Sequence, residues 1–283
     1  MSYCLIFPGQ GTQYPGMSRG LKLDNVLDPG LLALMDKGTG EELDQTFNAQ
    51  PAVLAVSAAL WERTGLEAPD AVMGHSLGEY TALVAAGCLR TSEAVELVKK
   101  RAAFMDSSMP RGSGSMAAVI GLSADEVTDA ISLLSDVWVA NLNGSSQIVI
   151  SGNTRSIEAA IPLLKGKGAK RVIPLKVSIA SHCPYMNNAK KALEEHLKDV
   201  ELERPSCPVV SNVSAKPETD PERIRMLLAE QLVSPVRFEE SVRNVDGMGI
   251  RRFIEIGPKS VLAPLVKRIV PGAEVEVVTN DEH

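Results

Sequence analysis

The sequence predicts an α/β fold in which a larger domain is interrupted by a small ferredoxin-like subdomain. Three observations support this. Residues 71–86 read as strand, tight turn and helix around Gly74–Gly78. Residues 114–178 show the order β-α-β-β-α-β, which is that of a ferredoxin-like unit. Strand patterns of the larger domain then resume near residue 209 and continue to residue 278.

The first part of the larger domain alternates strands with helices, as a parallel sheet requires. The strand Tyr3–Phe7 runs into the glycine-rich loop Pro8–Gln13. The following expected elements are a helix at Val53–Trp61, a strand at Ala71–Met73, a helix at Glu79–Ala86 and a helix that opens after Thr91 or Ser92.

The inserted subdomain is recognised by a capping box and a hairpin turn. Ser123 and Glu126 form the capping box of a helix that reaches about Leu134, and Asn143-Gly144 marks the hairpin. The expected strands and helix of this unit are Met116–Leu122, Val137–Leu142, Gln147–Ser151, the helix Ser156–Lys165 and the strand Arg171–Ile179. We therefore expect a discontinuous larger domain, 1–113 and 179–283, around a subdomain at 114–178. The larger domain resumes with a helix after Tyr185 and strands at Val209–Val213, Phe253–Ile256 and Val275–Val278.

Bulk composition narrows the class of protein. With 283 residues, of which 45% are hydrophobic, the chain can bury a full core, and no apolar run is long enough to span a membrane. The start of the chain lacks a basic region of a signal peptide, and the four cysteines are widely spaced, as reduced thiols of a cytoplasmic protein are. A net charge of −6 argues against nucleic acid as the main partner, and no metal site is expected.

The pentapeptide Gly74-His75-Ser76-Leu77-Gly78 is a G-x-S-x-G with a strand before it and a helix after it. That context is typical of a nucleophile elbow, in which glycines allow a sharp turn that exposes the serine hydroxyl. The helix N-terminus behind the serine favours negative charge that develops there. We expect Ser76 to be a nucleophile.

A serine nucleophile needs a neighbouring base, and the chain has four histidines. His75 neighbours Ser76 in the turn, so its side chain should diverge from that of the serine. His196 lies among lysines and glutamates on a solvated helix face, and His283 is the last residue. His182, between a strand and a helix, remains as the expected base, although a packed loop histidine is the alternative.

A carboxylate to complete a triad is harder to find. Most acidic residues between Ser76 and His182, among them Asp125 and Glu158, belong to helices of the inserted subdomain. The sequence therefore favours a Ser-His dyad whose histidine is oriented by a backbone carbonyl or an amide.

Arg101 falls on the apolar face of its helix. Ala94, Leu97, Val98 and Met105 form one stripe at helical spacing, and Arg101 lies near its middle. A buried guanidinium must be paired. It is either an internal salt bridge or a site for a ligand carboxylate, to which its planar fork is suited.

Five elements in this order resemble the malonyl-CoA:acyl carrier protein transacylases, the acyltransferase family of fatty acid and polyketide synthesis. They are Phe7-Pro8-Gly9-Gln10-Gly11, Gly74-His75-Ser76-Leu77-Gly78-Glu79-Tyr80, Arg101, Ser181-His182 and Ile256-Gly257-Pro258. The similar stretches run from Leu5 to about Ile269. The resemblance implies an α/β-hydrolase-like parallel-sheet domain with an inserted ferredoxin-like subdomain.

The resemblance also implies a ping-pong transfer without a cofactor. Ser76 would take the malonyl group from malonyl-CoA with His182 as base, and the phosphopantetheine thiol of holo acyl carrier protein would then accept it. Backbone N–H groups of Gln10 and Leu77 would form the oxyanion hole, and Arg101 would hold the malonyl carboxylate. The remaining matched positions are Gln231, expected to orient His182 through its main-chain carbonyl, His75 as a lining residue, and Gln50, which lines the site or marks a helix start.

Some alternatives stay open at this stage. Between Met17 and Glu41 the chain looks shorter than family members, as if a helical segment were missing, so we expect one wall of the site to differ in shape. A trans-acting polyketide acyltransferase and the malonyl-transfer subunit of malonate decarboxylase share these motifs, and a serine thioesterase or hydrolase uses the same elbow. Carrier docking is expected at the basic run that includes Lys170 and Arg171, for which a solvated helix end is the alternative.

Overall fold

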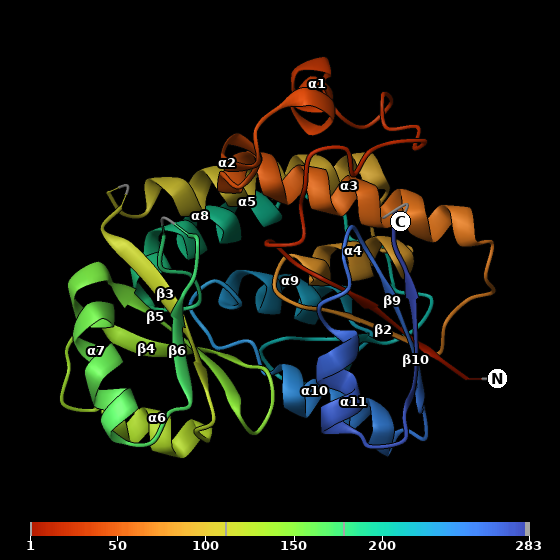
Figure 1. Cartoon of the computed structure of the whole chain (residues 1–283). Coiled ribbons are helices and arrows are strands. Elements are labelled where there is room, and N and C mark those ends of the chain that lie inside the picture. Colours follow the sequence, from red (N-terminus) through yellow and green to blue (C-terminus); the bar gives the residue numbers. More distant parts are fainter. Residues whose placement is uncertain (1, 111, 178, 281–283) are drawn as a thin grey trace.

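A computed structural model describes residues 2–110, 112–177 and 179–280, which form two sheets with helices packed against them (Figure 1). The larger sheet has the order β10-β9-β1-β2-β7-β8 and the smaller one the order β4-β5-β3-β6. The strands of the larger sheet are β1 (Cys4–Phe7), β2 (Ala71–Gly74), β7 (Val209–Val210), β8 (Pro217–Glu218), β9 (Arg252–Ile256) and β10 (Glu274–Val278). Those of the smaller sheet are β3 (Gly114–Ile120), β4 (Val137–Leu142), β5 (Gln147–Asn153) and β6 (Arg171–Pro174).

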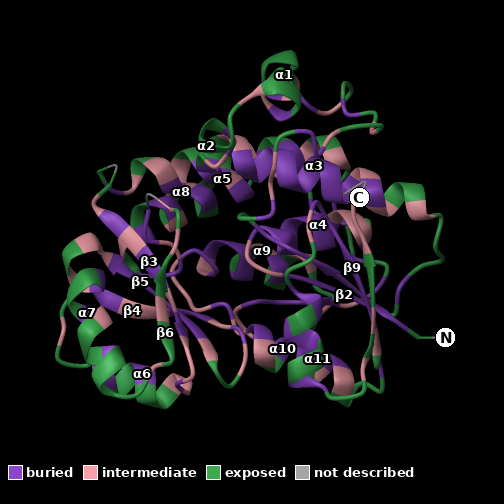
Figure 2. Cartoon of the chain, viewed as in Figure 1, coloured by how far each residue is buried: buried purple, intermediate pink, exposed green. Residues whose placement is uncertain are grey.

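Helices lie on both faces of the larger sheet (Figure 1). The helices of the larger domain are α1 (Pro29–Lys37), α2 (Gly40–Leu43), α3 (Thr46–Thr64), α4 (Gly78–Ala85), α5 (Thr91–Ser107), α8 (Asn187–Leu197), α9 (Pro221–Glu230), α10 (Phe238–Gly247), α11 (Ala263–Ile269) and the 3-10 turn η1 (Pro184–Met186). Two more helices, α6 (Ala124–Ile131) and α7 (Thr154–Gly166), cover the smaller sheet, and Figure 2 shows their outer surfaces exposed.

Strands β1 and β2 at the centre of the larger sheet carry no polar side chain, because both of their faces are covered. In β1, Leu5 and Phe7 join the core formed with α3, α4 and α5, whereas Cys4 and Ile6 join the core formed with α10 and α11. This alternation is the two-residue period of a strand. Pairing of β1 with β2 and β9 is parallel, as is that of β2 with β7. Continuous apolar runs are what buried parallel strands require.

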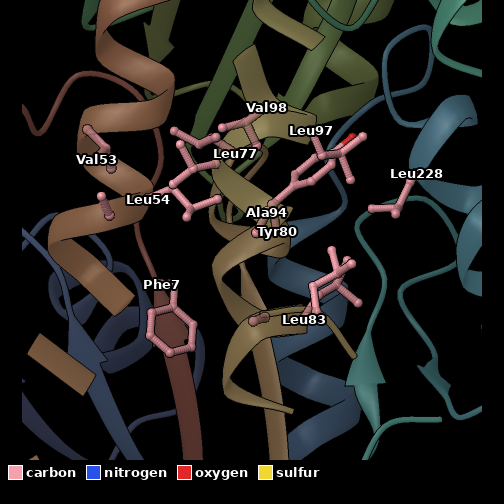
Figure 3. Packing of buried hydrophobic residues seen from close by; sticks show 14 of the residues in the cluster. Phe7, Val53, Leu54, Leu77, Tyr80, Leu83, Ala94, Leu97, Val98 and Leu228 are labelled. Atoms are coloured by element: carbon pink, nitrogen blue, oxygen red, sulfur yellow. The ribbon is translucent and has the colours of Figure 1, made fainter. Parts of the chain in front are cut away.

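Helix α4 directly behind the elbow is buried in the first of these cores. Figure 3 shows Leu77 and Tyr80 surrounded by side chains from other helices, among them Val53, Leu54 and Val98. Packing of this kind leaves the elbow little freedom to move, because protein interiors are close-packed.

The smaller sheet has the strand order and helices of a ferredoxin-like unit. β3 pairs antiparallel with β5 and β6, and β4 pairs antiparallel with β5. Helices α6 and α7 pack on one face through a core that includes Val127, Ile150 and Leu164. The α/β fold is confirmed: the larger sheet is parallel except for its edge strand β8, which pairs antiparallel with β7, and the smaller sheet is a separate antiparallel one.

Several expected element bounds were wrong. The strand expected at Arg171–Ile179 ends at Pro174, and position 178 lies outside the described residues. The strand expected at Val209–Val213 is only Val209–Val210. Helix α3 begins at Thr46, so the expectation of a helix start at Gln50 was also wrong. The segment between Met17 and Glu41 carries α1 and the start of α2.

The parallel strands end at a common edge of the larger sheet. The loops that the sequence predicts to carry the site lie at this edge. The loop beginning at Pro8 follows β1, the elbow follows β2, and Asn212 comes two residues after β7. In open α/β sheets this carboxyl edge is where ligands bind. His182 reaches the same place from the loop that follows the smaller sheet.

Candidate active site

The turn around Ser76 is tight enough to require its flanking glycines. A Cβ on Gly74 would lie 1.9 Å from the main chain of Gly78, and a Cβ on Gly78 would lie 2.0 Å from the Phe7 carbonyl oxygen. Ser76 itself has a φ of 52°, a left-handed conformation that costs a non-glycine residue about 1–2 kcal/mol. Backbone strain of this kind persists where surrounding contacts hold it, and it is characteristic of functional sites.

Ser76 and His182 form a hydrogen-bonded pair. The Ser76 Oγ lies 2.8 Å from His182 Nε2, and His182 Nδ1 lies 2.8 Å from the main-chain carbonyl oxygen of Gln231. A carbonyl only accepts hydrogen bonds, so Nδ1 carries a proton. In the neutral imidazole Nε2 is then the acceptor, and it receives the serine hydroxyl. The expected dyad geometry, with a backbone carbonyl in place of a third carboxylate, is present.

The electrostatic surroundings keep His182 uncharged. Burial and, next, the positive charge of Arg101 lower the pKa of His182 from 6.5 to about 3. The imidazole is therefore neutral near pH 7 and free to accept a proton.

Neither His75 nor His196 has a hydrogen bond to the Ser76 hydroxyl among the described residues. His75 Nε2 contacts Asn143 Oδ1 at 2.8 Å, and burial lowers the pKa of His75. His75 still lines the pocket. His196 is half-buried against the Phe104 ring, and His283 lies outside the described residues.

Arg101 is buried with 1% of its surface exposed, as its place on α5 predicts. Its Nη1 donates to Gln50 Oε1 at 2.7 Å, and its Nη2 donates to Gln231 Oε1 at 2.9 Å and to Ser76 Oγ at 3.2 Å. Within residues 2–110, 112–177 and 179–280, no Asp or Glu forms an ion pair with Arg101. Neutral amides thus hold the guanidinium next to the nucleophile, and its positive charge remains available to a ligand.

The two N–H groups expected to form an oxyanion hole belong to Leu77, which follows Ser76 directly, and to Gln10, which lines the same pocket as Ser76. Gly9, beside Gln10, packs against the elbow, because a Cβ there would lie 2.6 Å from the His75 carbonyl oxygen. In the part of the chain that the structure describes, no hydrogen bond occupies the N–H of Gln10 or Leu77. Both groups are free to bind an oxyanion.

A pocket of about 530 Å³ opens over these groups. Ser76, His182 and Arg101 line it, together with Gln10 and Leu77. The smaller sheet contributes an apolar wall of Met116, Ala118 and Val149, and the loop after β9 contributes Val261 and Leu262. A volume of this size accommodates the reacting part of an extended ligand. Gln50 is not among the residues that line this pocket. It contacts the site by accepting a hydrogen bond from Arg101.

The chain is similar to known proteins over most of its length. A sequence model described as the acyl transferase domain matches residues 4–279. The chain belongs to this acyltransferase family. It is 44% identical to the malonyl CoA-acyl carrier protein transacylase of Bacillus subtilis, over 93% of this chain and 89% of that one. It is 39% identical to the transacylase of the same name from Escherichia coli K12, over 95% and 93% of the two chains. The resemblance inferred from the motifs is confirmed.

Solved structures of the acyltransferase family extend the likeness to three dimensions. An acyl carrier protein S-malonyltransferase from Vibrio cholerae superposes with a TM-score of 0.92 at 39% identity, covering 99% of this chain and 97% of that chain. A malonyl-transacylase solved in complex with a type II PKS acyl-carrier protein gives a TM-score of 0.94 at 38% identity, covering 100% and 97%.

Sequence reasoning missed two buried residues that this acyltransferase places behind its nucleophile. Glu79 is 2% exposed and accepts a hydrogen bond from Gln231 Nε2 at 2.7 Å, and burial raises the pKa of Glu79 to about 7. Asn212 is 1% exposed and contacts the elbow through its side chain. The position of Glu79 directly after the elbow motif could have indicated its place in the site. Asn212 comes after a strand of only two residues, and no sequence pattern indicated its role.

Outside the pocket, Lys170 and Arg171 are exposed at the start of β6. The strand leads to Lys176, which is exposed and lines the pocket. Among the described residues, no helix is long and apolar enough to cross a membrane, and no cluster of three His, Cys, Asp or Glu side chains could hold a metal ion.

Proposed function

We propose that this chain is a malonyl-CoA:acyl carrier protein transacylase that works by a ping-pong mechanism through Ser76. One observation carries the proposal: Ser76 Oγ lies 2.8 Å from a neutral histidine and 3.2 Å from a buried arginine that forms no ion pair with an acidic residue of the described chain. The names of the relatives, and the carrier protein bound to one of them, support the same donor and acceptor.

In the first half-reaction, Ser76 Oγ attacks the thioester carbonyl of malonyl-CoA while His182 Nε2 takes the hydroxyl proton. The N–H groups of Gln10 and Leu77 stabilise the oxyanion that forms, as preorganised donors do in acyl transfer. The intermediate collapses, the carbon–sulfur bond breaks, and the CoA sulfur leaves with the proton that His182 returns. The product is a malonyl ester on Ser76.

In the second half-reaction, the thiol of the carrier's phosphopantetheine loses its proton to His182 and attacks the ester. The carbon–oxygen bond to Ser76 breaks, and the serine oxygen recovers the proton from His182. The enzyme returns to its starting state, and no external cofactor is consumed. Through both halves, the Gln231 carbonyl keeps the histidine tautomer correct by accepting from Nδ1.

Arg101 provides the preference for an acyl group that carries its own carboxylate. Its charge is held in a buried site by the amides of Gln50 and Gln231, neither of which neutralises it. A malonyl carboxylate bound there supplies the missing negative charge through the planar fork of the guanidinium. Acetyl groups cannot make this contact.

A single incubation distinguishes the proposed activity from hydrolysis. The protein is mixed with malonyl-CoA, with and without holo acyl carrier protein, and the products are weighed by mass spectrometry. Malonyl carrier is the expected product. Release of free malonate at the same rate with and without the carrier would instead identify a thioesterase.

The pathway and location follow from the same proposal. Malonyl carrier is the donor that fatty acid and polyketide chain extension consume, and we propose this context for the enzyme. Buried free thiols at Cys4, Cys88, Cys183 and Cys207 support a cytoplasmic location, because such thiols persist in a reducing compartment.

We propose that the carrier docks at the basic residues Lys170 and Arg171. Acidic carriers approaching a protein with a net charge of −6 need a local basic patch. Exchanging Lys170 and Arg171 for glutamate should raise the KM for the carrier and leave malonyl-serine formation unchanged. Steady-state kinetics with varied carrier, together with the rate of serine labelling, measure the two halves. Equal loss in both halves would mean that the exchange damages the fold.

A further inference from the structure

The side chain of Asn212 bridges both sides of the nucleophile elbow. Its Oδ1 accepts a hydrogen bond from the Ser76 N–H at 2.7 Å, and its Nδ2 donates to the Gly74 carbonyl oxygen at 2.6 Å. One amide therefore joins the residue at the end of β2 to the serine two positions later. The Ser76 N–H and the Gly74 carbonyl are a donor and an acceptor of fixed kind, so the orientation of the amide is fixed as well.

Asn212 is itself held from three directions. Its main-chain N–H donates to Glu79 Oε2 at 3.1 Å, and its carbonyl accepts from the Arg237 N–H at 2.9 Å. Its Oδ1 also lies 3.4 Å from Gln231 Nε2. With 1% of its surface exposed, the side chain has no water to exchange with these partners. A supporting side chain locked in this way can hold a site in its productive geometry.

The held conformation is the one that catalysis needs. The left-handed φ of 52° at Ser76 turns the chain so that Oγ meets His182 Nε2 while the Leu77 N–H stays free. Without a bridge between Gly74 and Ser76, the elbow can relax toward an ordinary conformation, because left-handed backbone is costly for serine. Relaxation would move Oγ and the oxyanion donor together.

We propose that Asn212 is a positioning residue that holds Ser76 in its strained conformation and so sets the rate of acylation. The proposal rests on the proposed role of Ser76 as nucleophile. Asn212 does not touch the substrate, and it does not contact Arg101. Its removal therefore slows acyl transfer from every donor by the same factor and leaves acyl preference unchanged.

The test compares wild type with Asn212→Ala, Asn212→Asp and the control Asn188→Asp, whose residue is exposed on α8. Alanine removes both bonds, while aspartate keeps the volume and the acceptor for the Ser76 N–H but places a carboxylate oxygen against the Gly74 carbonyl oxygen. Rapid mixing with malonyl-CoA or acetyl-CoA, followed by acid quench and intact-mass analysis, gives the rate of acyl-serine formation and the fraction of protein that reacts.

We expect Asn212→Ala to slow acylation about 100-fold with both donors, as a misplacement near 1 Å does. Asn212→Asp should slow it at least as much, because a buried carboxylate then faces the Gly74 carbonyl oxygen, and Asn188→Asp should match wild type. The KM for malonyl-CoA and the final labelled fraction should stay within twofold of wild type, which separates slow chemistry from loss of folded protein.

Wild-type acylation rates in both Asn212 variants would overturn the proposal, as would losses that only match a reduced labelled fraction. A change in the malonyl-to-acetyl ratio would also overturn it, because Asn212 would then act through Arg101. Absence of acyl-serine in wild type would overturn the proposed function itself, so the two failures are distinguishable.

Discussion

Replacing Arg101 with alanine should invert the acyl preference of the enzyme rather than abolish its activity. The change leaves a malonyl carboxylate buried without a partner, which costs about 3–5 kcal/mol. That corresponds to a fall of roughly two to four decades in kcat/KM for malonyl-CoA. The acetyl group of acetyl-CoA has no carboxylate that would be left without a partner, so the rate of acetyl transfer should stay the same or rise. Side-by-side rates of malonyl and acetyl transfer give the result.

Two further variants make the Arg101 experiment specific. Arg101→Lys should restore malonyl transfer poorly, because an ammonium cannot reproduce the two-pronged contact and cannot reach Gln50 and Gln231 together. Lys100→Ala removes an exposed positive charge from the same helix and should behave as wild type. If the rates of malonyl and acetyl transfer fall by the same factor, Arg101 stabilises the structure and does not bind the malonyl carboxylate.

Ser76→Ala should reduce transfer from both donors by about four decades or more, because loss of a nucleophile removes the covalent route altogether. Alanine fits the turn, since its Cβ occupies the position that the serine Cβ already has. The main-chain bonds from Ser76 to Asn212 and Gln231 do not involve the hydroxyl and should persist. Transfer assays with malonyl-CoA and acetyl-CoA test this, with a thermal melt as the check on folding. Residual transfer within tenfold of wild type would show that another residue carries the acyl group.

The sequence predicted the parts of the site that depend on local pattern. The elbow was predictable because only glycine fits two positions before and two positions after Ser76, and the buried position of Arg101 followed from helical spacing on α5. His182 was reached by elimination among four histidines. Each of these inferences used neighbours along the chain or a very small set of candidates.

The contacts that bind the site together come from distant parts of the chain and left no local signal. Asn212 lies 136 residues from Ser76, and Gln231 lies 130 residues from Arg101. Their roles depend on β7 and α9 ending beside the elbow, which is a property of tertiary packing. The early end of β6 at Pro174 has a simpler cause, because proline lacks the N–H that a continuing ladder would use.

In the proposed mechanism Ser76 carries the malonyl group between donor and carrier. The most direct measurement is the mass of the intact protein after incubation with malonyl-CoA alone, followed by peptide mapping. We expect the addition of one malonyl mass at Ser76, its loss on addition of holo acyl carrier protein, and a malonyl carrier as the product. An active enzyme that shows no label, or a label on any other residue, would contradict this mechanism.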